Sequence, residues 1–155
     1  MIIFYISKTS MQNPLDAIVL QGIEIWSIIF NEEIRVKYPP LTQHWLEWAM
    51  NVLVPLLFNI LEKQEQDNDE DTWNPHKAAA KFLGLLSQAC AVVELVLPYV
   101  LQSIGHADWH KRATALILIG SILDYPYQSL LEPRLVETMP GIIQLLSDPV
   151  SAVRD

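Results

Sequence analysis

Basic residues, cysteine and glycine are all scarce in this sequence of 155 residues. It has 10 Lys and Arg against 18 Asp and Glu, so its formal net charge is −8 at pH 7. Binding to nucleic acid needs a basic surface, and this charge argues against nucleic acid and other polyanions as partners. A negative surface instead attracts basic proteins and basic peptides through its long-range field.

The scarcity of cysteine and of long apolar runs bears on the cellular compartment. The single cysteine, Cys90, cannot form an internal disulfide, and its apolar surroundings favour a small packed hydrophobe. Polar residues interrupt every apolar run before it reaches the roughly 18 residues that a membrane span needs. Residues 1–6 are apolar but lack the basic leader and the cleavage site of a secretory signal. We therefore expect a cytoplasmic or nuclear protein without a membrane partner.

Motifs that carry chemistry are missing as well. Residues 67–78 superficially resemble a calcium-binding EF-hand loop, but the glycine and glutamate that such a loop requires are replaced by Thr72 and Ala78. His106 and His110 have the spacing of a zinc protease motif, but no glutamate follows the first histidine and no third ligand is evident. Nucleophile elbows, phosphate loops and dinucleotide fingerprints are absent. We expect no enzyme, no catalytic residue, no metal and no cofactor.

Apolar residues recur at helical spacing along almost the whole chain. With only 5 glycines and no Asn-Gly or Asp-Gly turn between alternating apolar runs, β-hairpins are not predicted. Residues 31–38 are polar and are followed by Pro39-Pro40, so we expect a loop there. The periodicity predicts an all-α fold with helices at about residues 16–30, 42–65, 75–89, 92–104, 109–123 and 133–146.

Two markers repeat at one interval along these helices. Pro55, Pro98 and Pro140 each stand between apolar residues and are spaced by 43 and 42 residues. Arg112 and Arg154 are also 42 residues apart. Periods of about 40 to 47 residues with two helices each are typical of HEAT repeats. We predict a right-handed α-solenoid of antiparallel helix pairs, HEAT- or armadillo-like, with about three and a half repeats. The alternative is an ordinary helical bundle with coincidental prolines.

Stacking explains why such a chain would form a single domain over residues 1–155. Each helix pair has an apolar face too wide to leave in water, and neighbouring pairs bury it together. The last residues open a second helix and then stop, so we expect a truncated stack. The expected units are a partial repeat 1–31, a repeat 41–90 with an acidic loop 62–73, a repeat 91–124 and a truncated repeat 129–155.

The acidic loop is the most unusual feature of the sequence. Six acids fall within ten residues that contain one base, Lys63; they are Glu62, Glu65, Asp67, Asp69, Glu70 and Asp71. Such a run repels itself and does not pack, so it should project between two helices. Taken alone, such a run favours a solvated insertion without a binding role over a charged recognition loop.

Trp73 ends the acidic run and has two interpretations. It can be an amphipathic contact surface beside the charges, as aromatic residues often are at interfaces. It can also pack the base of the loop between the two helices. Trp109 occupies the equivalent place before the next second helix, which favours packing for both residues.

Three segments resemble the middle HEAT repeats of the importin-β (karyopherin-β) family. They are residues 20–27, residues 64–79, and the end of the chain with Met139-Pro140, Ser147-Asp148-Pro149 and Val153-Arg154-Asp155. The acidic run followed by Trp-Asn-Pro is the specific element, whereas Asp-Pro followed by Val-Arg is common to HEAT repeats. Residues 1–10 match poorly, and the connection after Phe30 is shorter than in familiar members.

The resemblance implies a central fragment of a nuclear transport receptor that shuttles between cytoplasm and nucleus at the nuclear envelope and takes part in protein import. It implies Ran in its GTP-bound form, the basic importin-β-binding segment of importin-α or basic cargo signals as partners, and Phe-Gly nucleoporins for the full-length receptor. It further implies that Arg112 reaches an aspartate of a neighbouring turn, Asp108 or Asp148. A scaffold subunit of a phosphatase or signalling complex is the alternative function.

The implied binding site is the acidic loop. In the family the corresponding loop contacts basic surfaces of Ran and of importin-α, and its charges would speed encounter and set specificity. The resemblance assigns partner binding to Glu65, Asp67, Asp69, Glu70, Asp71 and Trp73.

Overall fold

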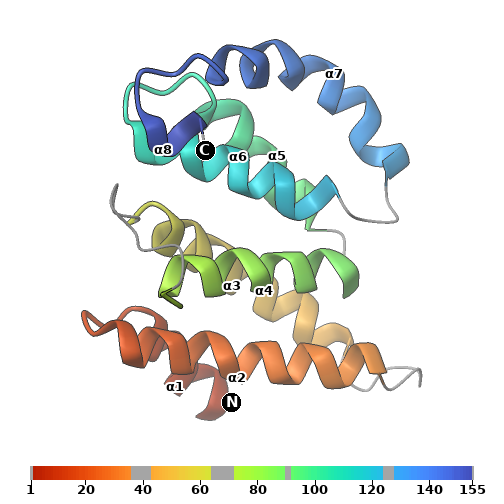
Figure 1. Ribbon diagram of the computed structural model, residues 1–155. Coiled ribbons are helices and arrows are strands. Elements are labelled where there is room, and N and C mark those ends of the chain that lie inside the picture. The colour runs from red at the N-terminus through yellow and green to blue at the C-terminus, as the bar shows by residue number, and fades with distance from the viewer. Residues whose placement is uncertain (1, 36–42, 64–71, 90–91, 124–127, 155) are drawn as a thin grey trace.

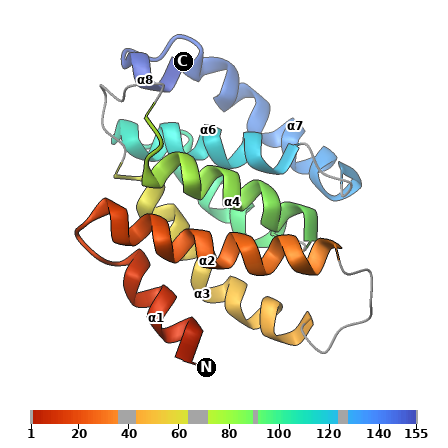
Figure 2. The ribbon, with the colours of Figure 1, turned by 60° about the horizontal axis from the view of Figure 1, so that its bottom comes forward.

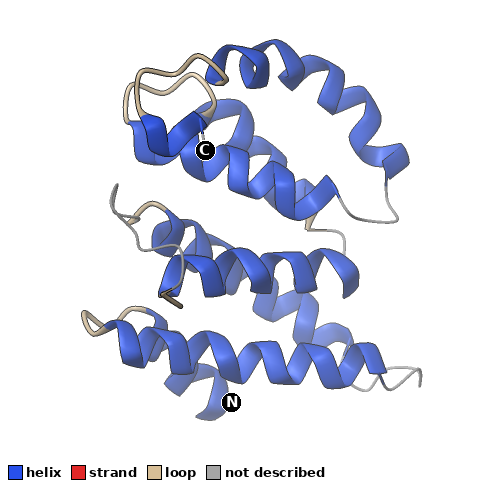
Figure 3. Cartoon of the chain, in the orientation of Figure 1, coloured by secondary structure: helices blue, strands red, loops and turns tan. Residues whose placement is uncertain are grey.

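The computed structural model describes residues 2–35, 43–63, 72–89, 92–123 and 128–154. Helices and short connections make up these residues, and none of them forms a strand (Figure 3). The helices in the described ranges are α1 (Ile2–Met11), α2 (Asp16–Arg35), α3 (Gln43–Leu61), α4 (Pro75–Ala89), α5 (Val93–Ser103), α6 (Trp109–Leu123), α7 (Gln128–Leu145) and α8 (Ser151–Arg154).

The helices form two layers of a stack. Each of the pairs α1 and α2, α3 and α4, and α5 and α6 packs together, and α8 rests on α6. Figures 1 and 2 show α1, α3, α5 and α7 following one another in one layer, which we call the first layer, while α2, α4 and α6 lie side by side in the second layer. This is the HEAT-type solenoid that the repeat spacing predicts, and it is not an ordinary bundle.

One apolar core runs through the stack because α4 is packed against α2 on one side and against α6 on the other. Phe30 of α2 lies edge-on against Phe82 of α4, with ring centroids 5.5 Å apart. Both rings are fully buried, as are Leu118 and Ile122 of α6 in the same core. Burying one such side chain stabilises the fold by about 1.5–3 kcal/mol. The second buried cluster in the described residues, formed by Ala113, Leu145 and Val153, is much smaller.

Small polar side chains join helices where the backbones approach closely. The indole Nε1 of Trp26 donates a hydrogen bond of 2.7 Å to the buried Oγ of Ser7, which links α2 to α1. The hydroxyl of Ser87 on α4 donates to the backbone oxygen of Ser121 on α6 at 3.0 Å. At Gly22 a Cβ atom would stand 3.0 Å from the carbonyl oxygen of Ser7, so only glycine permits this approach of α2 to α1.

Two helix limits differ from the predicted ones by five residues, and α3 ends at Leu61 although its helix is predicted to reach about residue 65. The loop predicted for residues 31–38 is wrong for residues 31–35, because α2 continues to Arg35; residues 36–38 lie outside the described ranges. Asn31 and Glu32 are exposed, and a polar turn facing water needs no packing to remain helical. The helix α7 begins at Gln128, so Pro133 lies inside it rather than at its start.

Two other expectations fall outside what the structure describes. Cys90 lies between described ranges, so its packing stays a prediction. The predicted repeat boundaries at residues 41, 90–91 and 124 also lie there, and the division into four repeats remains a prediction.

The repeated arginines fix the turns between helices. Nε of Arg112 donates to Oδ2 of Asp148 at 2.7 Å, and a second guanidinium nitrogen donates to Oδ1 at 2.9 Å. A third nitrogen of Arg112 donates to the backbone oxygens of His106 and Ala107. Arg154 donates to the backbone oxygen of Asp148 in the same manner. Of the two aspartates predicted as partners of Arg112, its side chain pairs with Asp148.

Asp148 holds two turns at once and is buried. Besides Arg112, its carboxylate accepts the backbone N–H of Val150 at 2.9 Å. Hydrogen bonding to the Arg112 guanidinium holds the pKa of Asp148 below its usual value. Asp108, by contrast, is exposed and accepts the backbone N–H of His110 at the start of α6.

We predict that Asp148→Ala lowers the free energy of unfolding by about 2 kcal/mol, since it leaves a charged guanidinium without its partner. Asp108→Ala, the matched control, removes an exposed cap and should cost less. Urea unfolding followed by far-ultraviolet circular dichroism measures both variants. Equal losses for the two variants would contradict the role assigned to Asp148.

The contribution of the Arg112–Asp148 contact to stability should depend on pH. The folded-state pKa of Asp148 is depressed, so its contribution is complete above the ordinary aspartate pKa of about 4 and declines as pH falls through the folded-state value. The difference in unfolding free energy between the unaltered chain and Asp148→Ala should therefore shrink in acid. A difference that stays constant with pH would count against the ion pair.

Candidate partner-binding surface

The middle of the predicted acidic loop lies in residues 64–71, outside the described ranges. This applies to Glu65, Asp67, Asp69, Glu70 and Asp71. The structure does describe the residues on both sides of them, Glu62 and Lys63 after α3 and Thr72 to Asn74 before α4. We call these flanking residues the two stems of the acidic segment.

The first stem is tied to the following helix pair. The Tyr99 hydroxyl of α5 donates a hydrogen bond of 2.5 Å to Oε1 of Glu62, and the ring of Tyr99 lies 4.6 Å from that of Phe58 between centroids. Burial, followed by the bond to Glu62, raises the pKa of Tyr99 above its usual value, so the hydroxyl keeps its proton and donates. Glu62, counted among the six acids, thus also has a structural partner.

The second stem is a helix start built from the sequence Trp-Asn-Pro. The side-chain Oδ1 of Asn74 accepts the backbone N–H of Lys77 at 3.0 Å, as an N-cap residue does. Pro75 is the first residue of α4, where its missing N–H costs nothing. The ammonium of Lys77 donates to the backbone oxygen of Thr72 at 2.9 Å. These contacts fix the chain where the acidic segment joins α4.

The two tryptophans that sequence analysis treated alike have different surroundings. Trp73 is 53 % exposed, and Nζ of Lys81 lies 5.6 Å from its ring centroid. Trp109 is partly buried against the small core of Ala113 and Leu145, and its ring stacks on that of His110 at 3.8 Å between centroids. The predicted packing role therefore holds for Trp109 and is wrong for Trp73, which offers an open indole surface.

A second aromatic surface lies between α1 and α3 in the first layer. The rings of Phe4 and Trp48 lie 4.4 Å apart between centroids, and Phe4 also meets Trp26 at 5.8 Å. Trp48 is 47 % exposed. Sequence analysis assigned no binding residue here, because Trp48 follows the apolar period of its helix and its exposure depends on how α1 packs. The pair joins adjacent helices of one layer, and the Trp48 side chain is about half exposed.

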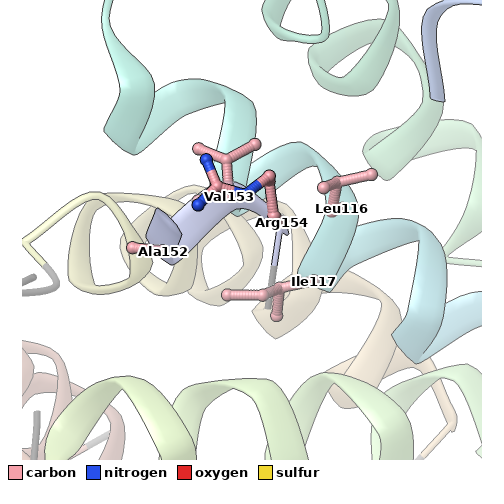
Figure 4. Close-up of a pocket in the computed structure, with 6 residues that line it drawn as sticks. Leu116, Ile117, Ala152, Val153 and Arg154 are labelled. Atoms are coloured by element: carbon pink, nitrogen blue, oxygen red, sulfur yellow. The ribbon is translucent and has the colours of Figure 1, made fainter. Parts of the chain in front are cut away.

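Features of other kinds of site are few in the described residues. Within the ranges that the structure covers, no three His, Cys, Asp or Glu side chains gather as a metal ion would require. None of the helices described there has the length and apolarity to cross a membrane. An open pocket of about 280 Å³ lies between α6 and α8, and its lining combines apolar side chains such as Leu116 and Val153 with Arg154 (Figure 4). Arg154 is the one charged side chain among the described residues that line this pocket, so the lining does not supply the two titratable groups that acid–base catalysis uses.

No protein-family model matches this chain. Curated relatives do: importin subunit beta-1 of Schizosaccharomyces pombe is 33% identical over 99% of this chain and 19% of the relative. The same subunit of Arabidopsis thaliana is 31% identical over 99% of this chain and 19% of its own length. The chain thus spans about a fifth of the length of these relatives.

Solved structures share the fold. Importin beta crystallised in an ammonium sulfate condition matches 98% of this chain and 19% of its own, with a TM-score of 0.89 and 28% identity. Yeast Kap95p, whose binding induces the switch loops of RanGDP to adopt the GTP-bound conformation, matches 97% and 19% with a TM-score of 0.88 and 28% identity. The Kap95:Nup1 complex matches 97% and 19% with a TM-score of 0.87 and 27% identity.

Similarity along almost the whole chain and a shared stack of helix pairs show that this chain belongs to the importin-β family.

Proposed function

We propose that this chain is part of a nuclear transport receptor, which works by binding and not by catalysis and which moves between cytoplasm and nucleus across the nuclear envelope. Its relatives are importin β subunits, and one structural neighbour acts on the switch loops of RanGDP. Their shared fold along the chain is the observation that carries the proposal. The proposed partners of this part are Ran in its GTP-bound form and the basic importin-β-binding segment of importin-α or basic cargo signals.

The acidic segment is the proposed contact for these basic partners. Residues 64–71 carry five acids and no base, a density of charge that attracts a basic surface from a distance. The stems are fixed by the Tyr99–Glu62 hydrogen bond and by the Asn74 cap, so the segment leaves and rejoins the stack at set points. Such complementarity raises the association rate and the specificity more than the affinity.

Trp73 is the proposed uncharged contact residue of this site, beside the acidic side chains. Its exposed indole already lies near the ammonium of Lys81, a geometry that attracts cations to the ring face. A lysine or arginine of a basic partner could occupy the same face while its neighbours pair with the acids. Exposed aromatic side chains beside charges often contribute most to binding energy.

Nucleoporins with Phe-Gly motifs are the proposed partners of the first layer. One structural neighbour is a complex of Kap95 with Nup1. The exposed ring of Trp48 beside Phe4 provides an aromatic surface between two adjacent helices, on which a phenylalanine ring of a partner could pack edge-on or offset.

We predict that replacing Asp67, Asp69, Glu70 and Asp71 together by Asn and Ser weakens binding of Ran-GTP, and of a basic importin-β-binding peptide, about tenfold at low salt. The reason is the loss of four charges that attract both partners. Biolayer interferometry on the 155-residue chain measures the affinities and their salt dependence.

The control removes four exposed acids elsewhere, by Asp16→Asn with Glu24→Gln, Glu94→Gln and Glu132→Gln. It should retain binding, and both variants should keep their helicity. Equal weakening by the control would mean that net charge alone attracts the partners. Equal capture of Ran-GTP and Ran-GDP would favour the scaffold alternative over a transport receptor.

We predict that Trp48→Ala weakens capture of a Phe-Gly peptide at least severalfold, because it removes half of the aromatic surface. Trp73→Ala changes the same residue type at a site of similar exposure and should leave that capture unchanged. Fluorescence anisotropy with a labelled Phe-Gly peptide compares the two variants. If Trp73→Ala weakens capture of the peptide more than Trp48→Ala does, the peptide binds at Trp73 and the first-layer site is wrong.

A further inference from the structure

The exposed ring of Trp73 already lies beside a cation of its own chain. Trp73 belongs to the second stem, close before α4, and Lys81 is a residue of that helix. Nζ of Lys81 stands 5.6 Å from the centroid of the ring, within the range over which an aromatic face attracts an ammonium group. Side chains on a helix point toward its N-terminus, so the long side chain of Lys81 reaches back along α4 to the ring.

The backbone on both sides of this ring is held by other residues. Lys77 lies four residues before Lys81, on the same side of α4, and its ammonium donates to the backbone oxygen of Thr72 at 2.9 Å. Oδ1 of Asn74 accepts the backbone N–H of Lys77 at 3.0 Å. Neither bond uses the side chain of Lys81. Replacing that side chain therefore removes the cation at the Trp73 ring and leaves the stem in place.

The contact between Lys81 and Trp73 is weak enough for a partner to displace it. Both side chains are exposed, and an exposed contact of a cation with an aromatic ring changes an equilibrium by about two- to fivefold. A lysine or arginine of a partner that binds the same face must first move the ammonium of Lys81 away, since like charges repel each other at short distance. The ring thus carries, from its own chain, the kind of group that the proposed site takes from a partner.

We propose that Lys81 competes with basic partners for the ring of Trp73 and thereby lowers their affinity for this chain. The inference rests on the proposed function of Trp73 and adds the regulation of that site. Partners that place a lysine or arginine on the ring bind at the cost of the internal contact, and loss of the charge at Lys81 relieves them of it.

Binding of the basic importin-β-binding peptide to the 155-residue chain, measured by biolayer interferometry, tests this proposal. Lys81→Met retains an unbranched side chain without the charge and should raise the affinity about two- to fivefold. Lys81→Arg is the conservative control; it retains a cation that stacks on aromatic rings and should give no gain. In a chain that carries Trp73→Ala, adding Lys81→Met should also give no gain, because there is no ring for Lys81 to cover. Circular dichroism should show unchanged helicity in all variants.

Two results would overturn the proposal while leaving the proposed function intact. The first is an equal gain from Lys81→Met with and without Trp73, which would come from the net charge and not from the ring. The second is binding of the peptide by the unaltered chain with no gain in Lys81→Met. If the peptide binds to none of these chains, the proposed function itself is wrong, and the competition falls with it.

Nuclear magnetic resonance of the lysine side chains follows the displacement itself. In the free chain the ring current of Trp73 should shift the ε-methylene protons of Lys81 upfield, and the Lys81→Met variant identifies this signal by losing it. Addition of the basic peptide should return the signal toward its ordinary position. A shifted signal that stays unchanged when the peptide is bound would show that the peptide leaves Lys81 on the ring and would contradict the competition.

Discussion

The shared apolar core between neighbouring second-layer helices is the constraint on which the rest of this structure depends. Helix α4 is buried against α2 on one side and α6 on the other, and Phe82 touches Phe30 across the first of these contacts. A helix pair isolated from its neighbours would expose those rings to water. Order along the chain therefore comes from contacts between pairs, and each pair is held in place by the next.

This arrangement gives the residues on both sides of the acidic segment fixed positions in the stack. Hydrogen bonds at the edges of the core, such as the one from Tyr99 to Glu62, connect consecutive pairs and hold the stems of the acidic segment. The pairing of Arg112 with Asp148 holds the following turns in the same way. The stack thus fixes both stems of the acidic segment, with the exposed ring of Trp73 on the second of them, while Phe4 and Trp48 form a separate aromatic surface in the first layer.

The sequence predicts what depends on local spacing and misses what depends on distant contacts. Helical periodicity and the proline interval are local, so the helices and the solenoid follow from them, whereas an aspartate as the partner of Arg112 is implied by the resemblance to HEAT repeats and not by spacing. The exposure of Trp73 and the partner of Glu62 depend on how the next helix pair packs, which no local pattern contains. The continuation of α2 to Arg35 was missed because polar residues suit a solvated helix end as well as a loop.

Native-state hydrogen exchange on a Phe82→Leu variant tests most directly whether one core joins the helix pairs. The smaller side chain loosens the contact of α4 with its neighbours without removing its apolar character. If the core is shared, amide protection falls in α2, α4 and α6 together, since their opening is coupled. A loss of protection confined to α4, with α2 and α6 unchanged, would show that the pairs are stable independently and would contradict the account.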